Sequence, residues 1–143
     1  VARPHQELRT MESRRVLPAQ ISRAAAVHQA AQVGAMVAAL AASDYALLGR
    51  AIDDRIAEPA RAALLPGFRE AKRAAMDAGA LGSSISGSGP TSFALVRGHS
   101  AGERVAAAMA SAYTMCGHNS DVRVARIDRQ GARLLTQEPG ARR

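Results

Sequence analysis

The sequence has one cysteine, Cys116, no tryptophan, two phenylalanines and two tyrosines. A single cysteine excludes an internal disulfide framework and a CxxC metal pair, and it is typical of a reducing, cytoplasmic setting. Proteins that bind single-stranded nucleic acid usually stack bases on aromatic rings, so the scarcity of such rings argues against that class. The 143 residues are nevertheless enough to bury a core without disulfides or metal.

Lysine is nearly absent as well, and long hydrophobic runs are missing. Lys72 is the only lysine among 19 basic side chains, which give the chain a net charge of +7. The arginines are spread from Arg3 to Arg143 between acidic residues, a pattern typical of a solvated surface. No apolar run reaches the roughly 20 residues of a membrane span, and no signal-peptide pattern opens the chain. We therefore expect no membrane as the partner, and a nucleic acid is the less favoured one.

Periodicity and chain-breaking residues predict alternating strands and helices. Residues 1–10 are expected to form an extended segment at a sheet edge. A long Ala-rich helix is expected over 19–42, where close helix packing would offset the cost of Gly34, about 1 kcal/mol. Its expected buried stripe is Ile21, Ala25, Val27, Ala31, Ala35 and Ala38. The remaining expected elements are a helix capped by Ser43 and interrupted by Pro59, a turn over 61–65, a helix over 68–78, a strand over 92–96, a helix opened by a capping box at Ser100–Glu103, a strand over 122–127 and a short return strand over 133–135.

This order predicts an α+β fold, a two-layer sandwich in which helices cover one face of an antiparallel sheet. Residues 1–137 are expected to form the domain and residues 138–143 a disordered tail. The chain is too helical for a β-barrel, and it lacks the regular βα alternation of a Rossmann domain.

The stretch Ser86-Gly87-Ser88-Gly89-Pro90 has the composition of a functional loop. Its glycines permit positive φ and close approach of a ligand, and successive backbone N–H groups can form an anion-binding concavity. A tight turn that needs glycine for steric reasons explains the same composition, so the spacing leaves both interpretations open. The loop is no Walker A motif, because Gly-Lys-[Ser/Thr] does not occur. It also precedes a strand, whereas a dinucleotide fingerprint follows a strand and opens a helix.

The segment Ser86-Gly87-Ser88-Gly89-Pro90-Thr91 resembles the third motif of the GHMP kinases. Three further stretches resemble the homoserine kinase branch of that family. They are residues 10–18 (TMESRRVLP), Glu58-Pro59-Ala60-Arg61 leading into Leu65-Pro66-Gly67-Phe68, and Ala125-Arg126-Ile127-Asp128 before Gly131-Ala132. The four stretches occur in the family's order over nearly the whole chain.

The resemblance implies the ferredoxin-like C-terminal domain of an enzyme that transfers the γ-phosphoryl group of ATP to the hydroxyl of L-homoserine, in threonine biosynthesis. The family's ATP-phosphate loop and its acidic residue near the transferred phosphate belong to an N-terminal kinase domain that is absent from this chain. ATP and Mg²⁺ are therefore expected to bind mainly there, and no catalytic residue is expected here. The expected partners are L-homoserine and that N-terminal domain, and a homodimer is left open.

The resemblance also implies roles for individual residues. Arg14 and Arg61 would bind the homoserine carboxylate and backbone, because a planar guanidinium pairs well with a carboxylate. Ser86, Gly87, Ser88 and Gly89 would line the cleft. Spacing alone favours two ordinary surface arginines, and only the resemblance reverses this interpretation.

Two alternatives remain open. The chain could be a non-catalytic basic α+β domain that binds RNA or another polyanion through its arginines, or part of a different GHMP small-molecule kinase. No metal site is expected, because no histidine has a carboxylate or cysteine at metal-ligand spacing. Asp53 and Asp54 would point about 100° apart on a helix, so we expect them in a salt bridge or on a solvated face.

Overall fold

The computed structural model describes residues 1–132 and residue 134, and its centre is a four-stranded antiparallel sheet with the strand order β2-β3-β1-β4. Together with two core helices, the chain follows a β-α-β-β-α-β order, the ferredoxin-like arrangement. The predicted α+β class is therefore confirmed. The strands are β1 (Ala2–Pro4), β2 (Gly82–Ile85), β3 (Ser92–Leu95) and β4 (Ser120–Val122).

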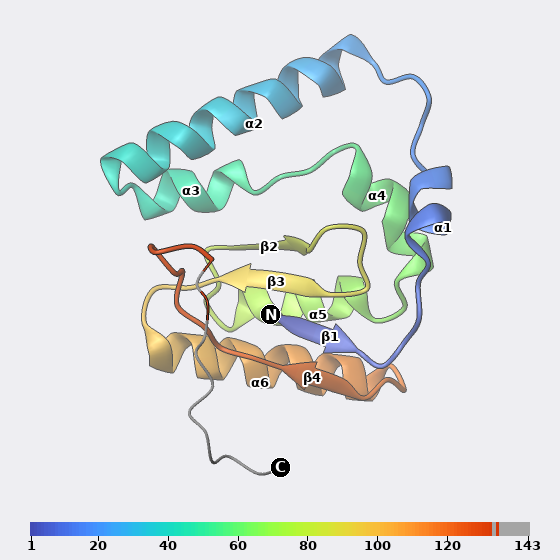
Figure 1. Cartoon of the computed structure of the whole chain (residues 1–143), viewed down its shortest axis with the longest axis vertical. Coiled ribbons are helices and arrows are strands. Elements are labelled where there is room, and N and C mark those ends of the chain that lie inside the picture. Colours follow the sequence, from blue (N-terminus) through green and yellow to red (C-terminus); the bar gives the residue numbers. More distant parts are fainter. Residues whose placement is uncertain (133, 135–143) are drawn as a thin grey trace.

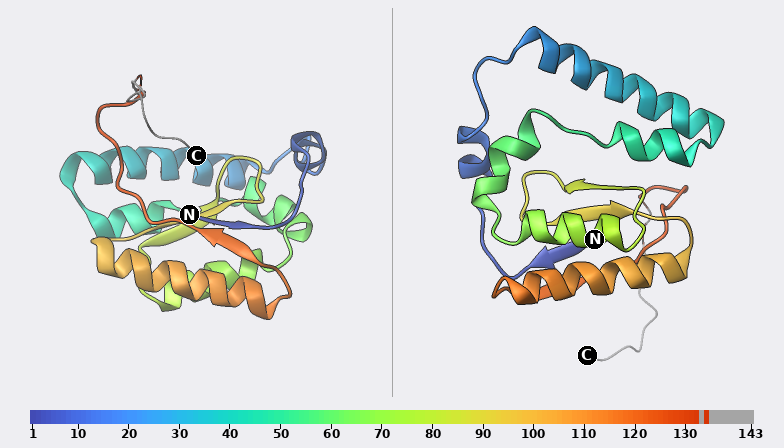
Figure 2. Two further views of the ribbon diagram at one scale, coloured as in Figure 1. Left: turned by 60° about the horizontal axis from the view of Figure 1, so that its bottom comes forward. Right: turned by 180° about the vertical axis from the view of Figure 1, so that it is seen from behind.

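Two helices, α5 (Phe68–Asp77) and α6 (His99–Met115), cover one face of this sheet (Figure 2). The core between these layers consists of small and medium side chains around one large ring. Tyr113 on α6 is fully buried, and its hydroxyl lies 3.1 Å from the Ser92 hydroxyl on β3. The core cluster contains Ala2, Ala71, Ala75, Ala80, Val105, Met109, Ala112 and Tyr113.

All other helices lie in one insertion between β1 and β2. They are α1 (Thr10–Arg15), α2 (Arg23–Ala42), α3 (Tyr45–Ala51), α4 (Ala57–Arg61) and a 3-10 turn (Ala62–Leu64). Helices α2 and α3 form an antiparallel pair beyond the β2 side of the sheet (Figure 1). Contact between α3 and the start of β2 is close, because a Cβ at Gly49 would lie 2.3 Å from the carbonyl oxygen of Leu81. Only glycine allows this approach.

Helix α2 differs from its prediction in start and in orientation. It begins at Arg23 because the Ser22 side chain caps it, accepting a hydrogen bond from the Ala25 amide at 3.1 Å. The predicted buried stripe is largely wrong. Val27 is 63% exposed, and Ile21, Ala31 and Ala38 are exposed as well. Gly34 has no heavy atom within 4 Å of where its Cβ would stand, so the predicted packing there is absent among the described residues.

Several boundaries also differ. Strand β1 pairs with β3 and β4 inside the sheet, not at an edge. Strand β2 was not predicted, because its sequence Gly-Ser-Ser-Ile has low strand propensity. Asp44, not Ser43, caps α3, and α6 starts after Gly98 without the predicted capping box. The segment predicted as a turn over 61–65 is the end of α4 and the 3-10 turn, and β4 ends at Val122, where the predicted strand began.

Other expectations concern the C-terminus and the membrane. The tail over 138–143 lies outside the described residues, and so does most of the return strand over 133–135. Helix α2 has 20 residues and an apolar composition, which suffice for a membrane span. The expectation that no segment reaches this threshold is therefore wrong, although core helices of many proteins also meet it.

Tyr113 provides a test of the core. Burial raises the pKa of its phenol, so the folded state favours the neutral form. That stability is fully present below the unfolded pKa of about 10 and is lost as pH rises through the higher folded value. We expect Tyr113→Phe to lower the free energy of unfolding by about 1 kcal/mol at neutral pH and to flatten the loss of stability above pH 10.

Denaturant unfolding at a series of pH values measures both effects. Tyr45→Phe is the matched control, because Tyr45 is 43% exposed and keeps its ring contact with Arg97 after the change. Equal alkaline slopes for the wild type and Tyr113→Phe would contradict the assignment.

Candidate active-site corner

The glycine-rich segment is a loop between the paired strands β2 and β3. Gly87 and Gly89 both have positive φ, 61° and 84°, in the region that side chains other than glycine rarely adopt. The Gly89 amide donates to the Ser86 carbonyl at 3.1 Å, and the Ser86 amide donates to the Thr91 carbonyl at 2.8 Å. These bonds close a tight turn. The geometry of this turn is therefore enough to explain why the loop contains glycines, with or without a bound ligand.

Two side chains from the helical insertion hold the carbonyl groups of this loop. The Ser13 hydroxyl on α1 donates to the Ser88 carbonyl at 2.7 Å, and Arg61 Nη1 on α4 donates to the Gly87 carbonyl at 2.9 Å. Arg61 Nε also donates to the Ser13 carbonyl at 3.2 Å. Ser13 is fully buried. As a result α1, α4 and the loop meet in one corner of the molecule.

Two backbone amides of this loop, unlike its carbonyls, have no hydrogen-bond partner among the described residues. Within the described part of the chain, the N–H groups of Gly87 and Ser88 donate to no protein acceptor. Their carbonyls face the insertion, while these two amides remain free for an acceptor outside the chain. Adjacent free amides in a turn with positive φ are the arrangement that binds anions. The corner can therefore offer hydrogen bonds to a phosphate or carboxylate.

Both arginines suggested by the family motifs belong to this corner. Arg14 follows Ser13 on α1, and its side chain is exposed and makes no hydrogen bond or ion pair with any described residue. Arg61 is half-buried and uses Nε and Nη1 for backbone carbonyls, so Nη2 remains without a partner in the same part of the chain. Arg61 thus supports the loop directly, a role that its spacing in the sequence did not indicate.

A largely buried cluster of Glu58, Lys72 and Ser84 links α4 to α5 and β2. The Glu58 carboxylate pairs with Lys72 on α5 and accepts a hydrogen bond of 2.6 Å from the Ser84 hydroxyl on β2. The Glu58 and Lys72 side chains are only 15% and 28% exposed. Arg61 lies one helical turn after Glu58, and β2 leads into the loop. The cluster therefore fixes the two elements that carry the corner.

The acidic pair at 53–54 joins α3 to α4. These residues lie between the helices, not on one, and their two carboxylates have separate tasks. Asp54 accepts hydrogen bonds from the amides of Ile56, Ala57 and Glu58 at the start of α4. Asp53 contacts His28 at 3.0 Å and forms a salt bridge with Arg55 at 3.1 Å, which is one of the two alternatives expected from the sequence.

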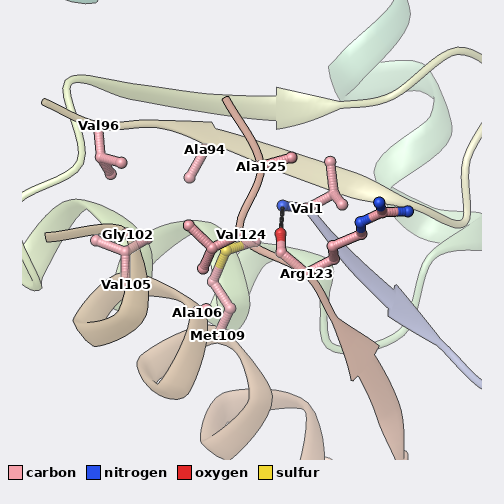
Figure 3. Close-up of a pocket in the computed structure, with 10 residues that line it drawn as sticks. All are labelled: Val1, Ala94, Val96, Gly102, Val105, Ala106, Met109, Arg123, Val124 and Ala125. Carbon is pink, nitrogen blue, oxygen red and sulfur yellow. Dashed lines mark hydrogen bonds between the residues drawn. The ribbon is translucent and has the colours of Figure 1, made fainter. Parts of the chain in front are cut away.

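Two further features of the described chain concern metal binding and a small cavity beside α6. No group of three His, Cys, Asp or Glu side chains over residues 1–132 is arranged to hold a metal ion. A cavity of about 60 Å³ between the sheet and α6 is lined by Val, Ala, Gly and Met residues with Arg123 (Figure 3). Its drawn hydrogen bond joins the Val1 nitrogen to the Arg123 carbonyl at 2.9 Å. This space is small and partly open to solvent, and backbone polar groups line it together with apolar side chains.

Residues 36–114 match the family described as GHMP kinases C terminal. The chain belongs to this family. The match runs from the second half of α2 through the glycine loop to the last turn of α6, so it includes β2, β3 and the two core helices but neither β1 nor β4.

Similar proteins support a narrower relationship. The chain is 50% identical over 137 residues to the homoserine kinase of Chlorobium phaeovibrioides and 48% identical over 135 residues to that of Chlorobaculum tepidum. These matches cover 92% and 93% of the chain but 42% of each relative. A crystal structure of homoserine kinase from Cytophaga hutchinsonii superimposes with a TM-score of 0.84 at 46% identity, covering 85% of this chain and 39% of that one. The chain thus spans less than half the length of its relatives.

Sequence reasoning missed three residues of the corner. Ser13 and Glu58 stand inside the motifs that suggested the arginines, but a serine or glutamate on a helix usually faces solvent. Lys72 carried a usable signal, since it is the only lysine in an arginine-rich chain. The single lysine could thus have been singled out as a candidate for a specific ion pair.

The Glu58 cluster predicts a stability effect. Glu58→Gln leaves the Lys72 ammonium without its counter-charge in a largely buried position, so we expect the free energy of unfolding to fall by about 2 kcal/mol. Adding Lys72→Met removes the stranded charge and should restore part of that loss. Chemical unfolding of both single variants and the double variant measures the coupling. Glu70→Gln, at an exposed position on α5, is the control; additive effects of the Glu58 and Lys72 changes would contradict the cluster.

Proposed function

We propose that the protein containing this chain transfers the γ-phosphoryl group of ATP to the hydroxyl of L-homoserine, and that this chain is its C-terminal, substrate-binding half. The observation that carries the proposal is the anchored glycine loop, whose Gly87 and Ser88 amides are free while Arg61 holds the Gly87 carbonyl. Homoserine kinases are among its relatives. Phosphoryl transfer depends mainly on positioning and charge stabilisation, and a rigid loop with free amides supplies both.

The two arginines and the loop amides have different roles in this proposal. Arg14 is free to pair with the substrate carboxylate, and Arg61 offers Nη2 while its other nitrogens keep the loop in place. The loop amides face the reacting groups across the cleft, where the N-terminal kinase domain brings most of the ATP site. When bound, ATP supplies the phosphoryl group. No acidic cluster of the described residues fits Mg²⁺, so no step is assigned to that ion here.

The proposal includes a cellular setting and partners. We place the enzyme in the cytoplasm and in threonine biosynthesis, where phosphorylated homoserine is formed. Its partners are L-homoserine, its own N-terminal domain and a second copy of the protein, with no membrane and no nucleic acid. The RNA-binding alternative and a different small-molecule kinase draw no support from the relatives named above.

Arg61→Ala tests the substrate site. Loss of charge-assisted hydrogen bonds should raise the homoserine KM of the intact protein by about tenfold to a hundredfold, and the ATP KM by less than about threefold. Steady-state kinetics with each substrate varied in turn separates the two constants. Arg104→Ala is the control, since Arg104 is exposed on α6 in the other layer. A homoserine KM that stays at the wild-type value would remove Arg61 from the site.

Activity of the isolated chain tests the division between domains. We expect the 143-residue chain to fold and to phosphorylate no homoserine, because most of the ATP site lies outside it. A coupled ADP-release assay compares it with the intact protein at equal concentration. Turnover by the isolated chain above the blank would show that this division is wrong.

A further inference from the structure

Strand β1 is shorter than the stretches that flank it. It has three residues, Ala2–Pro4, whereas strands in globular proteins commonly have about five or six. The sequence predicts strands over 92–96 and 122–127, yet β4 ends at Val122, the residue that pairs with Ala2. The residues that follow, 124–127 (VARI), therefore have the composition of a strand and no strand to pair with among the described residues.

The end of β3 has backbone groups that face away from β2. The Phe93 carbonyl accepts a hydrogen bond of 2.7 Å from the Ser83 hydroxyl, and the Leu95 carbonyl accepts one of 2.8 Å from the Leu81 amide. Successive residues of a strand direct their backbone groups to opposite sides. Those of Ala94 and Val96 therefore face the side of β1, and Val96 makes no backbone hydrogen bond with any described residue.

The segment after β4 continues a ladder that β1 begins. The Arg123 amide donates to the Val1 carbonyl, and the Val1 nitrogen donates to the Arg123 carbonyl, both at 2.9 Å. In an extended continuation, the backbone groups of Ala125 and Ile127 face the same side as those of Arg123. Neither residue makes a backbone hydrogen bond with any described residue. Both flanking stretches thus offer free backbone groups at two-residue spacing.

A cavity of about 380 Å³ lies between these stretches, lined by residues 94–96 and 124–127 together with Gly98 and His99. The smaller space of about 60 Å³ beside α6 has Val1 at its edge (Figure 3). The two spaces share part of their lining, namely Ala94, Val96, Val124 and Ala125. We call them together the β1 groove, since they extend from Val1 between the neighbours of β1.

The floor of the β1 groove is apolar and belongs to α6. Val105 and Met109 line it and are only 2% and 1% exposed. Gly102 lies below both walls, because a Cβ on this residue would stand 2.7 Å from Val124 Cγ1 and 3.4 Å from Val96 Cγ2. An occupant therefore needs an extended backbone for the walls and apolar side chains at alternate positions for the floor.

The polypeptide that precedes Val1 in the intact protein has the shortest route into this groove. The homoserine kinases named above extend well beyond this chain, which covers 42% of their length. The Val1 nitrogen is hydrogen-bonded in register with Arg123, so a residue attached to it stands between the two walls. A tethered segment also competes at a high effective concentration, which a strand from another molecule lacks.

We infer that the residues immediately before Val1 in the intact protein extend β1 through the β1 groove, between β3 and residues 123–127. By the register of β1, the residue directly before Val1 faces Ala94 on one side and Val124 on the other. A strand with two neighbours, and not a flexible linker, then joins this chain to the N-terminal half. The inference rests on the proposed division of the protein into two halves, but its test records backbone pairing and not turnover. Its failure would therefore leave the proposed kinase activity untouched.

Amide hydrogen exchange of the intact protein, followed residue by residue by NMR, tests the pairing. We expect the Val96 and Ala125 amides to exchange at least about a hundredfold more slowly than the Arg126 amide. Arg126 is the internal control, because its amide faces the open edge of the sheet beyond β4. Exchange at Val96 and Ala125 as fast as at Arg126 would overturn the inference. Protection that rises with protein concentration would assign the groove to a strand from another molecule and would also overturn it.

Two neighbouring proline variants of the intact protein give a second measurement. Ala125→Pro removes an amide that the extended β1 needs, so we expect the urea midpoint of unfolding to fall by about 1 M. Arg126→Pro is the matched control, since proline is tolerated where the lost amide faces solvent, and its midpoint should fall by less than about half as much. An Ala125→Pro protein that does not fold, beside a folded Arg126→Pro protein, would support the inference in the same way. Equal effects of the two substitutions would contradict it.

Discussion

The corner formed by α1, α4 and the glycine loop depends on the hydrogen bonds of the Arg61 guanidinium. This group donates to two backbone carbonyls that are 74 positions apart in the chain, those of Ser13 and Gly87. Charged donors to backbone carbonyls are stronger than neutral ones, and a planar fork can hold two acceptors at once. Because the loop's carbonyls are drawn toward the insertion, its Gly87 and Ser88 amides are left free. The chemistry offered to a ligand is thus a consequence of how the loop is held.

The rest of the insertion keeps Arg61 in place. Asp54 caps α4 through three amides, and Glu58 fastens the same short helix to β2 and α5. A helix of five residues has little stability of its own. Its position therefore comes from side chains at its start and on its inner face, not from propensity. This explains why polar residues, which are usually exposed, are buried here in a satisfied network.

The sequence predicted the class of fold and the loop, and it failed where tertiary contacts override local preference. Helix α5 and strand β3 follow clear patterns and were predicted within a residue or two. Strand β2 was missed because Gly82, Ser83 and Ser84 have the composition of a turn, and only pairing with β3 makes them a strand. The stripe on α2 was assigned to the wrong side because periodicity shows that residues share a face, not which partner covers it. The role of Arg61 as a support for the loop needs the distances, since spacing cannot show which groups a long side chain reaches.

The interior position of β1 has a consequence for the order of folding. Ala2 on β1 pairs with Ser92 on one side and with Val122 on the other. Of the four strands, β1 is therefore synthesised first, but it has both neighbours only after β4 has been synthesised. Contacts across some 90 and 120 residues carry a high loop-closure cost and slow the formation of a sheet. Helices α2 and α3, which are neighbours in the sequence and pack against each other, can form before β1 gains its partners. The ribosome-bound chain is therefore expected to hold a helical intermediate whose sheet closes only after β4 is released.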